Sequence, residues 1–398
     1  MGLNETARGQ QLHIGIFGVR NRKSSLINTI TNQNISLVSD YAGTTTDPVY
    51  KPMELNPIGP VVFIDTAGFD DQGDLGKLRV EKTKQAAQKT DIAIILLNHK
   101  GDFSLEKQWI DIFKKSKIPY ILLINKSDLL SKKEINNLKE KANELFKSIP
   151  IVTSMVENVG VDQLKEKISL LVPQEFENLS ITGSLVKEDD IVLLVMPQDI
   201  QAPKGRLILP QVQTIRELLD KKCIVVSTVV EKMEQALKAI SKSPRLIITD
   251  SQVFKLVYEK KPKDSLLTSF SVLFAALKGD IEYFINGAKE IEKLTELSNV
   301  LIAEACTHAP LSEDIGREKI PNMLRKKFGE KINIKIVSGV DFPEDLTNYD
   351  LIIHCGGCMF NRKHIISRVE KAKNQKIPMT NYGVVIAYLS GILEKIDF

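Results

Sequence analysis

LHIGIFGVRNRKSSLIN, residues 12–28, combines a short apolar run, a polar loop and the apolar start of a helix. The loop is similar to the phosphate-binding pattern G-x-x-x-x-G-K-S/T, in which backbone N–H groups surround a phosphate. Four residues separate Gly18 from Lys23 and Ser24, so the loop is one residue short and lacks its second glycine. That glycine lets the backbone curl toward phosphate. The sequence therefore predicts a phosphate loop with weakened nucleotide binding or slow hydrolysis, and an altered sequence at this point is an equal alternative.

Short apolar runs alternate with charged stretches of helical periodicity along the rest of the chain. This alternation predicts an α/β fold in which helices cover both faces of mostly parallel sheets. We expect an N-terminal P-loop domain at 1–172, a small α/β domain at 180–262 with three strands, and a third α/β domain at 264–398. SLLTSFSVLFAALKG (265–279) predicts a helix. The predicted strands are 12–17, 61–65, 91–98 and 120–125 in the first domain, 190–197, 223–228 and 245–250 in the second, and 300–306, 332–339 and 350–355 in the third.

The composition argues against several classes of protein. The 398 residues carry a net charge of +4 and no long basic block, which argues against nucleic acid as a partner. The longest apolar runs, such as IAIILL, are too short to cross a bilayer, and the polar N-terminal sequence is unlike a secretory signal. Four cysteines without a secretory context indicate a reducing compartment. We therefore expect a cytoplasmic protein without a membrane partner.

Four further motifs accompany the loop, and two of them directly follow predicted strands. In DTAG, Asp65 is predicted to reach Mg²⁺ through water and the Gly68 amide to sense a γ-phosphate. In NKSD, the Asp128 carboxylate can accept hydrogen bonds from N1–H and the 2-amino group of guanine. Adenine lacks this donor pair, so NKSD selects GTP over ATP. The others are GTTTDP (43–48), a polar loop with threonines suited to Mg²⁺, and TSM (153–155), placed to close over the base.

These five motifs in this order resemble the translation-factor-like GTPases of the TrmE and Era group over about the first 170 residues. The resemblance implies GTP hydrolysis, with Lys23 on the β- and γ-phosphates and Ser24 and Thr45 on Mg²⁺. It places Asn21 beside a potassium ion that could replace an arginine finger. One departure is Thr46, where the group has arginine. The implied catalytic residues are Lys23, Thr45, Asp65 and Gly68, and the implied GTP-binding residues are Gly18, Asn21, Lys23, Ser24, Ser25, Asn125, Lys126, Asp128 and Ser154.

Three of the four cysteines lie in two segments of the last quarter of the chain, EACTHAP and IIHCGGCMF. The segments contain C-x-H and H-C-x-x-C, and each directly follows a predicted strand. Because the carboxyl ends of parallel strands meet at one edge of a sheet, the two segments can form one site. Three thiolates with an exchangeable ligand suit an iron–sulfur cluster, thiolates with histidines suit zinc, and a redox C-x-x-C is the third option. The candidate ligands are Glu304, Cys306, His308, His354, Cys355 and Cys358.

The order of these parts resembles the HydF family of [FeFe]-hydrogenase maturation GTPases over essentially the whole chain. The resemblance implies a [4Fe-4S] cluster on Cys306, Cys355 and Cys358. It leaves the fourth ligand among the nearby His308, His354 and Glu304. It further implies a homodimer that carries a di-iron precursor, received from two radical-SAM maturases, to apo-[FeFe]-hydrogenase, with GTP modulating the exchange of partners.

Two other functions fit the motifs without this resemblance. One is a regulatory GTPase of the ribosome or tRNA-modification type with a zinc-binding appendage. The other is an iron–sulfur electron carrier with a vestigial nucleotide domain. Anaerobic reconstitution with iron discriminates among the three functions. A colourless protein that retains zinc would exclude both the maturation factor and the electron carrier, because each depends on iron.

Overall fold

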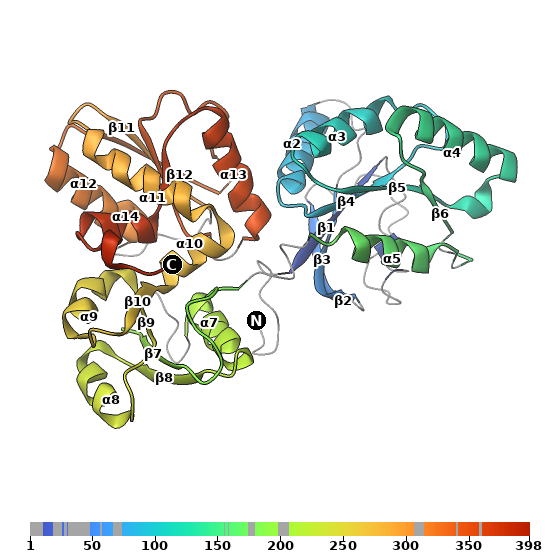
Figure 1. The fold of residues 1–398 in the computed structure, drawn as a ribbon. Helices are drawn as coiled ribbons and strands as arrows, with labels where there is room; N and C mark the ends of the chain where they lie inside the picture. The colour runs from blue at the N-terminus through green and yellow to red at the C-terminus, as the bar shows by residue number, and fades with distance from the viewer. Residues whose placement is uncertain are drawn as a thin grey trace. The chain divides into compact units, whose positions relative to one another are not determined.

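Three sheets organise the chain in the computed structural model (Figure 1). One sheet belongs to residues 1–178, and the other two belong to residues 179–398, which form a second unit. The predicted fold class, α/β with a mostly parallel N-terminal sheet and further α/β parts, is confirmed. The structure describes residues 11–18, 26–27, 30, 48–55, 58–66, 74–154, 156–157, 159–173, 180–197, 207–305, 314–339, 341–357 and 360–398.

A mixed sheet forms the centre of the first unit. Its described strands, in spatial order, are β2 (Val49–Leu55), β3 (Gly59–Asp65), β1 (Leu12–Gly18), β4 (Ile92–Leu96), β5 (Tyr120–Asn125) and β6 (Ile151–Thr153). All pairings are parallel except that of β2 with β3. The strands predicted for this domain are all present. The edge strands β2 and β6 were not predicted, because β2 consists mostly of exposed and half-buried residues that form no apolar run and β6 has only three residues.

Helices cover both faces of this sheet, because successive residues of a strand point to opposite sides. They are α2 (Asp74–Ala87), α3 (Ser104–Lys115), α4 (Lys132–Phe146) and α5 (Val161–Leu171). Ile14 and Ile16 of β1 pack with Leu164 of α5 on one face. Phe17 packs on the other face with Trp109 of α3, in a cluster that α4 also joins. Figure 1 accordingly shows α5 across the sheet from α3 and α4.

His13 of β1 should make the stability of this unit depend on pH. Its side chain is buried, Nδ1 lies 2.9 Å from the backbone oxygen of Gln11, and burial lowers its pKa from 6.5 to about 4. His13 therefore becomes protonated near pH 6.5 in the unfolded chain but only near pH 4 in the folded chain. The free energy of unfolding is expected to fall as pH drops through this window, by about 3 kcal/mol at pH 4.

Urea unfolding of the wild-type chain and of His13→Gln, at several pH values between about 7 and 4, measures this contribution as the difference between their pH slopes. Carboxylates that titrate in both proteins cancel in the comparison. Equal slopes would show that His13 is not the group responsible.

A parallel sheet opens the second unit. Its described strands, in spatial order, are β10 (Leu266–Ser269), β9 (Leu246–Thr249), β7 (Ile191–Val195) and β8 (Ile224–Thr228). The accompanying helices are α7 (Leu209–Asp220), α8 (Met233–Ala239), α9 (Phe254–Lys260) and α10 (Phe270–Lys278).

Two predictions for this region are wrong. Residues 265–279 are not one helix, because 266–269 form β10, and the expected three-stranded sheet has a fourth described strand as a result. Ser269 ends the strand and caps α10, since its hydroxyl accepts a hydrogen bond from the Val272 amide at 3.1 Å. β10 lies on the C-terminal side of the domain border drawn from the sequence, yet it pairs in the second sheet.

The third sheet is also parallel. Its described strands, in spatial order, are β12 (Asn333–Ser338), β11 (Asn299–Glu304), β13 (Leu351–His354) and β14 (Met379–Asn381). The three predicted strands are present, and β14, with only three residues, was not predicted. The helices are α11 (Ile281–Lys289), α12 (Ile320–Phe328), α13 (Arg362–Asn374) and α14 (Tyr382–Leu389), and a π-helical turn spans Ile315–Lys319.

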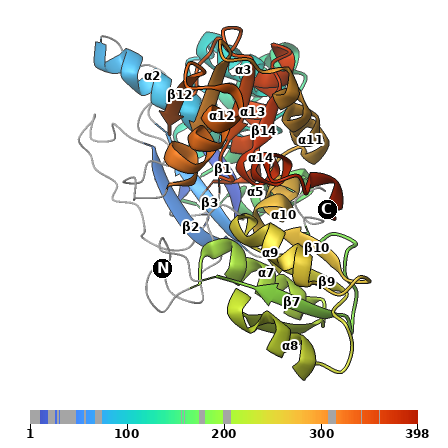
Figure 2. The same ribbon diagram turned by 90° about the vertical axis from the view of Figure 1, so that its left-hand side faces the viewer.

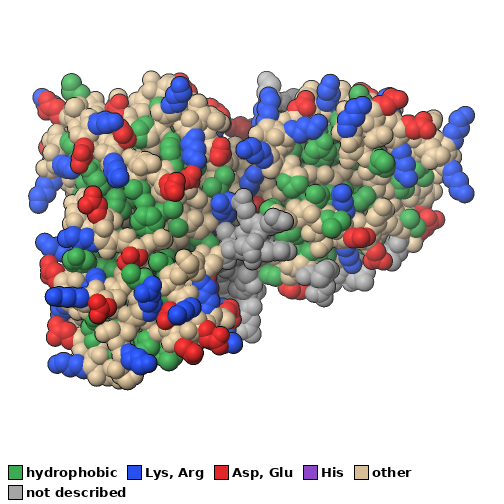
Figure 3. All heavy atoms as spheres, viewed as in Figure 1, with side chains coloured by type: hydrophobic (Ala, Val, Ile, Leu, Met, Phe, Trp, Pro, Cys, Tyr) green, Lys and Arg blue, Asp and Glu red, His purple; other side chains and the backbone are tan. Residues whose placement is uncertain are grey.

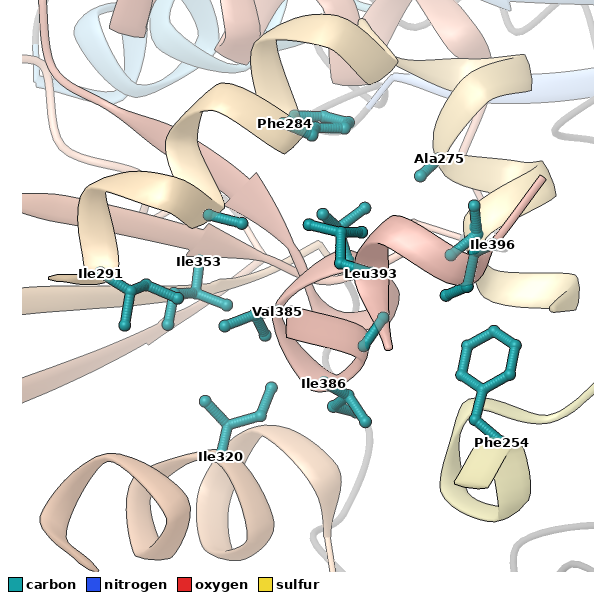
Figure 4. Close-up of a cluster of buried hydrophobic side chains, with 14 of the residues drawn as sticks. Phe254, Ala275, Phe284, Ile291, Ile320, Ile353, Val385, Ile386, Leu393 and Ile396 are labelled. Carbon is teal, nitrogen blue, oxygen red and sulfur yellow. The ribbon is translucent and has the colours of Figure 1, made fainter. Parts of the chain in front are cut away.

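One hydrophobic core joins the second and third sheets. It contains Ile247 of β9 and Ile353 of β13, and Figure 4 shows Phe254 of α9 beside Ile396 near the end of the sequence. Asp397 continues this contact, because its amide donates to the Leu267 carbonyl of β10 at 2.9 Å. Figure 2 shows the same neighbourhood of α9, α10 and α14 from a second direction. Residues 179–398 are therefore held together by apolar packing as well as by the chain.

The surface carries charges of both signs. On the viewed face of each unit, Figure 3 shows Lys and Arg side chains interspersed with Asp and Glu side chains. Among the described residues, no helix has the length and apolar character that a membrane-spanning segment needs.

Candidate functional site

Three residues predicted for nucleotide binding lie at the carboxyl ends of strands in the first sheet. Gly18 ends β1, Asp65 ends β3 and Asn125 ends β5. A Cβ atom at Gly18 would lie 2.7 Å from Cβ of Leu96 in β4, so a larger residue there would push the strands apart. In an open parallel sheet, this edge is where ligands bind.

The Asp65 carboxylate is held at the start of the DTAG loop. Asp65 lies opposite Ile16 in the pairing of β1 with β3, and its side chain is buried. The hydroxyl of the next residue, Thr66, donates to the Ile16 carbonyl at 2.7 Å and ties the start of the loop to β1. This places a carboxylate beside the end of β1, where the sequence predicts that Asp65 reaches magnesium through water.

The NKSD segment folds into a tight turn after β5. The Asn125 side-chain oxygen accepts hydrogen bonds from the Lys126 amide at 2.8 Å and the Thr153 hydroxyl at 3.2 Å. Lys126 itself has a positive φ of 60°, an uncommon conformation for a residue with a side chain. His99 Nε2 lies 2.7 Å from the Asn125 backbone oxygen. The asparagine is thus fixed from three sides and orients the turn.

The Asp128 carboxylate is oriented by the loop that follows β6. Its Oδ1 accepts a hydrogen bond of 2.6 Å from the hydroxyl of Ser154, a buried residue. The same hydroxyl oxygen accepts from the Glu157 amide at 3.2 Å, and the Ser154 and Val159 backbones pair in both directions. Each carboxylate oxygen can accept two hydrogen bonds, so Asp128 can still receive two donors from a base. NKSD and the first two residues of TSM, Thr153 and Ser154, are therefore joined by hydrogen bonds.

Six predicted residues of the nucleotide site lie outside the described residues: Asn21, Lys23, Ser24, Ser25, Thr45 and Gly68. Their roles remain predictions. The described part contains the residues expected to read guanine and Asp65 of the magnesium site. It shows that Thr153 of the TSM motif contacts Asn125, and it adds His99, which the motifs did not indicate; the only sequence signal for His99 is that it follows β4 closely.

The two cysteine-bearing segments meet at the carboxyl end of the third sheet. Cys355 directly follows β13, and its amide donates to the Ala303 carbonyl of β11 at 2.9 Å. The Ala305 amide in turn lies 3.0 Å from Cys355 Sγ. Ala305 directly precedes Cys306 in the sequence, so the structure brings the described start of the EACTHAP segment, up to Ala305, to the Cys355 thiol. An N–H group aimed at sulfur also favours the thiolate, the form that binds metals.

A buried lysine supports the C-x-x-C turn. Lys278, at the end of α10, is 3% exposed and donates to the carbonyls of Gly357 at 3.0 Å and Phe360 at 2.8 Å. Gly357 has a positive φ of 56°, and a Cβ atom there would lie 2.4 Å from Ile365 Cδ1. The turn after Cys355 thus depends on glycine and on a positive charge from another helix, which the motif did not indicate.

Glu304 is already engaged by neighbouring side chains. This 4%-exposed carboxylate accepts hydrogen bonds from Arg317 Nη2 at 2.9 Å and from the Ser338 hydroxyl at 2.7 Å. To bind a metal, it would have to give up at least part of this arrangement.

His354 is engaged at both ring nitrogens. Nδ1 lies 2.6 Å from the Cys355 carbonyl oxygen, and Nε2 lies 2.9 Å from Nη1 of Arg368. Since the guanidinium can only donate, Nε2 accepts and Nδ1 carries the proton. Burial, together with the Arg368 charge, lowers the pKa of His354 to about 3. His354 is fully buried and, as arranged, positions Cys355 through the backbone.

The remaining candidate ligands, Cys306, His308 and Cys358, lie outside the described residues, within which no three His, Cys, Asp or Glu side chains form a metal site. The donor set nevertheless suits a metal centre rich in thiolates. Cys355 has an N–H donor at its sulfur and a buried lysine behind its turn, and both favour negative charge on sulfur and on a cluster.

The contribution of the ion pair between Glu304 and Arg317 to stability can be tested by substitution. Arg317→Met should leave a buried carboxylate without its counter-ion and lower the free energy of unfolding by about 2 kcal/mol, less than for a fully buried pair because Arg317 is one-third exposed. Urea unfolding measures the loss. Arg325→Met is the control, since its partner Glu330 is exposed and 3.8 Å away, and we expect a change of at most about 0.5 kcal/mol.

A second substitution separates charge from packing. Adding Glu304→Gln to Arg317→Met removes the unpaired charge and should restore part of the lost stability. If Arg317→Met is as mild as Arg325→Met, the ion pair does not stabilise this strand end.

Two models of one protein family match the second unit. The hydrogen maturase F dimerization domain matches residues 181–279, and the hydrogen maturase F tetramerization domain matches residues 282–396, together more than half of the chain. The chain belongs to the hydrogen maturase F family. This confirms the resemblance to HydF, and the border between the two matches falls directly after α10. A third model, the 50S ribosome-binding GTPase, matches residues 13–126 and confirms a GTPase domain of the TrmE and Era type.

The curated relatives that match part of the chain are GTPases. GTPase Der of Wolinella succinogenes is 34% identical over 186 residues, which cover 44% of this chain and 39% of the relative. The tRNA modification GTPase MnmE of Streptococcus agalactiae is 33% identical over 149 residues, or 37% of this chain and 30% of the relative. The matched region thus spans less than half of these relatives. A solved structure of Era from Aquifex aeolicus has a TM-score of 0.37 and 17% identity, covering 57% of this chain and 98% of that one.

Proposed function

We propose that the chain is a GTP-hydrolysing maturation factor of [FeFe]-hydrogenase. Membership of the hydrogen maturase F family and the GTPase domain support this function. The described contacts add the base-reading part, because Ser154 orients the Asp128 carboxylate on which selection of guanine depends. Magnesium would be held by Ser24 and Thr45, with Asp65 acting through water, and Lys23 and the Gly68 amide would contact the phosphates.

The shortened phosphate loop sets an expectation for the rate of hydrolysis. The phosphates would still be contacted by Gly18, Asn21, Lys23, Ser24 and Ser25. Because the loop is one residue short and lacks one glycine, fewer backbone amides can point at the phosphates. We propose slow hydrolysis that potassium stimulates through Asn21, to be measured with and without the ion.

We further propose that the chain holds a [4Fe-4S] cluster on Cys306, Cys355 and Cys358. The observation that carries this proposal is the 3.0 Å contact between the Ala305 amide and Cys355 Sγ, since it brings the two cysteine segments together. When bound, such a cluster would supply an iron with an exchangeable ligand. Glu304 and His354 are held by hydrogen bonds, so either would have to rearrange to become the fourth ligand, and His308 is the remaining candidate.

The cargo would be the di-iron precursor of the hydrogenase active site. We propose that the chain receives it from two radical-SAM maturases and delivers it to apo-[FeFe]-hydrogenase. A GTPase changes the order of its switch loops with the γ-phosphate, and this can favour one partner over another. The GTPase unit would thereby time the exchange while the third sheet holds the cargo.

We also propose a homodimer that forms through β8. Among the described strands, β8 pairs only with β7, so it leaves an open edge that another chain can extend. Ile224 on this strand is 54% exposed, and Val212 and Leu219 of the adjacent α7 are also exposed. Apolar side chains beside an open strand edge favour pairing of two copies. The matching family model is itself named for dimerization.

Anaerobic reconstitution with iron and sulfide, followed by incubation with the di-iron precursor and apo-[FeFe]-hydrogenase, tests the whole proposal. Hydrogen evolution that requires both the iron-loaded chain and the precursor would support it. A chain that stays colourless and retains zinc would contradict it and favour a regulatory GTPase with a zinc-binding appendage. A loaded chain that never activates the hydrogenase would contradict delivery alone.

A further inference from the structure

The carboxyl end of the third sheet contains a tyrosine that neither the sequence motifs nor the family assignment points to. Tyr382 follows β14 directly, and β14 pairs in parallel with β13, which ends before Cys355. Asn381 caps the helix that Tyr382 begins, by accepting a hydrogen bond from the Gly383 amide at 2.9 Å. The backbone at Tyr382 is therefore fixed at the same sheet edge as the cysteine.

The Tyr382 hydroxyl is buried and has no hydrogen-bond partner among the described residues. Two other tyrosines of this unit have one: Tyr283 donates to the Ile377 carbonyl, and Tyr388 donates to Glu292 at 2.7 Å. A buried hydroxyl without a partner costs about 1–3 kcal/mol, so proteins rarely keep one without a reason.

The charges of four groups influence the Tyr382 hydroxyl, and Cys355 and Glu304 of the candidate cluster site are among them. Burial raises the pKa of Tyr382 above its usual range, and negative charge on Cys355, Glu304 and Asp314 raises it further, against the opposing charge of Arg317. The group therefore keeps its proton and can act only as a neutral hydroxyl.

The two carboxylates whose charge acts on Tyr382 accept hydrogen bonds from other groups. Glu304 accepts from Arg317 and Ser338, and Asp314 Oδ1 accepts from the Gly316 and Arg317 amides at 2.8 and 3.0 Å. Gly316 also brings backbone against the hydroxyl, since a Cβ atom there would lie 2.0 Å from Tyr382 Oη. The hydroxyl is therefore held against the backbone at Gly316, and none of the described residues accepts its hydrogen bond.

We propose that the Tyr382 hydroxyl donates a hydrogen bond to a sulfur of the iron–sulfur cluster bound at Cys355, either the cysteine thiolate or a sulfide. The inference rests on the proposed cluster. Thiolate and sulfide sulfurs accept hydrogen bonds, and donors to these atoms raise the reduction potential because they stabilise the added negative charge. Binding of the cluster would give the buried hydroxyl the partner that it lacks.

The first experiment compares reduction potentials of the reconstituted full-length chain. Tyr382→Phe removes the donor but keeps the ring, and it should make reduction about tenfold less favourable, a decrease of about 59 mV for one electron. Tyr388→Phe is the matched control, because it removes a hydroxyl from the same helix that is bonded to Glu292, and its potential should not change.

The second experiment uses the wild-type sequence and so does not depend on how the variant folds. Tyrosine deuterated at the two ring carbons beside the hydroxyl is incorporated, and pulsed electron paramagnetic resonance of the reduced cluster is recorded. A deuterium coupling should appear in the wild-type chain and in Tyr388→Phe. Where Tyr382→Phe takes up iron, the coupling should be absent from it.

The outcomes separate this inference from the proposed function. A wild-type chain that takes up no cluster overturns both. A loaded wild-type chain without deuterium coupling overturns the tyrosine contact and leaves the cluster in place. Unchanged potential in a loaded Tyr382→Phe chain also overturns it. A coupling in the wild type supports the contact even if Tyr382→Phe cannot be loaded.

Discussion

Replacing Cys355 by serine is expected to abolish iron–sulfur binding while leaving GTP hydrolysis within about twofold of the wild-type rate. Cys355 stands where both cysteine segments meet, and its sulfur is the one placed beside the Ala305 amide. Hydrolysis should persist because the nucleotide motifs belong to residues 1–178, a separate unit. Iron content after anaerobic reconstitution and the broad absorption near ~400 nm measure the first effect, and phosphate release measures the second.

Cys223→Ser is the matched control for this substitution. Cys223 is buried in the second sheet's core, and its sulfur lies 3.3 Å from the Lys187 carbonyl, which a serine hydroxyl can also reach. The control should bind as much iron as the wild type. If Cys355→Ser keeps its iron, Cys355 is not a ligand; if it loses GTP hydrolysis together with iron, the two units do not work separately.

Replacing Asp128 by asparagine is expected to lower affinity for GTP by about 10²–10³-fold. The asparagine can accept only one of guanine's two hydrogen bonds, without the carboxylate charge, and turns a donor toward the other, so about 3–4 kcal/mol of binding is lost. An amide offers one acceptor and one donor, which suits xanthine because its C2 carries oxygen instead of an amino group. Affinity for the xanthine nucleotide should therefore rise. Titration with fluorescent GTP, ATP and xanthosine triphosphate measures the three affinities.

Two variants calibrate this result. Ser154→Ala removes only the 2.6 Å hydrogen bond that orients Asp128, and should weaken GTP binding by about 5–30-fold without creating a preference for xanthine. Asp111→Asn makes the same chemical change at an exposed position of α3 and should have no effect. An unchanged ratio of GTP to ATP affinity in Asp128→Asn would refute its role in reading the base.

Much of the fold could be predicted because its strands are short, apolar and buried. The apolar runs that end at Asp65 and Asn125 predicted strands, and the polar motifs at their ends predicted a nucleotide site. The prediction failed at 266–269, where the strand leads into α10 without a turn and both elements are apolar. Periodicity cannot divide such a stretch, and only pairing with β9 shows where the strand ends.

The cysteine site shows a different limit of the sequence. The pattern of cysteines and histidines suggested ligands, but it could not show that His354 and Glu304 are held by Arg368 and Arg317. These arginines come from helical segments, and no neighbouring residue in the sequence distinguishes them from solvent-exposed arginines. Lys278 is a similar case, since it lies 79 residues before the carbonyl of Gly357 that it binds. Such contacts arise from tertiary packing and leave no local pattern.

The core that joins the second and third sheets has a consequence for assembly. Side chains of β9 and β13 share one apolar interior, so residues 179–398 should turn as a single body and not bend between the sheets. If two copies meet along β8, each copy's Cys355 edge then faces a direction fixed by that junction. The spacing and mutual angle of the two cargo positions would stay constant through the nucleotide cycle, and an incoming client protein would always meet the same geometry.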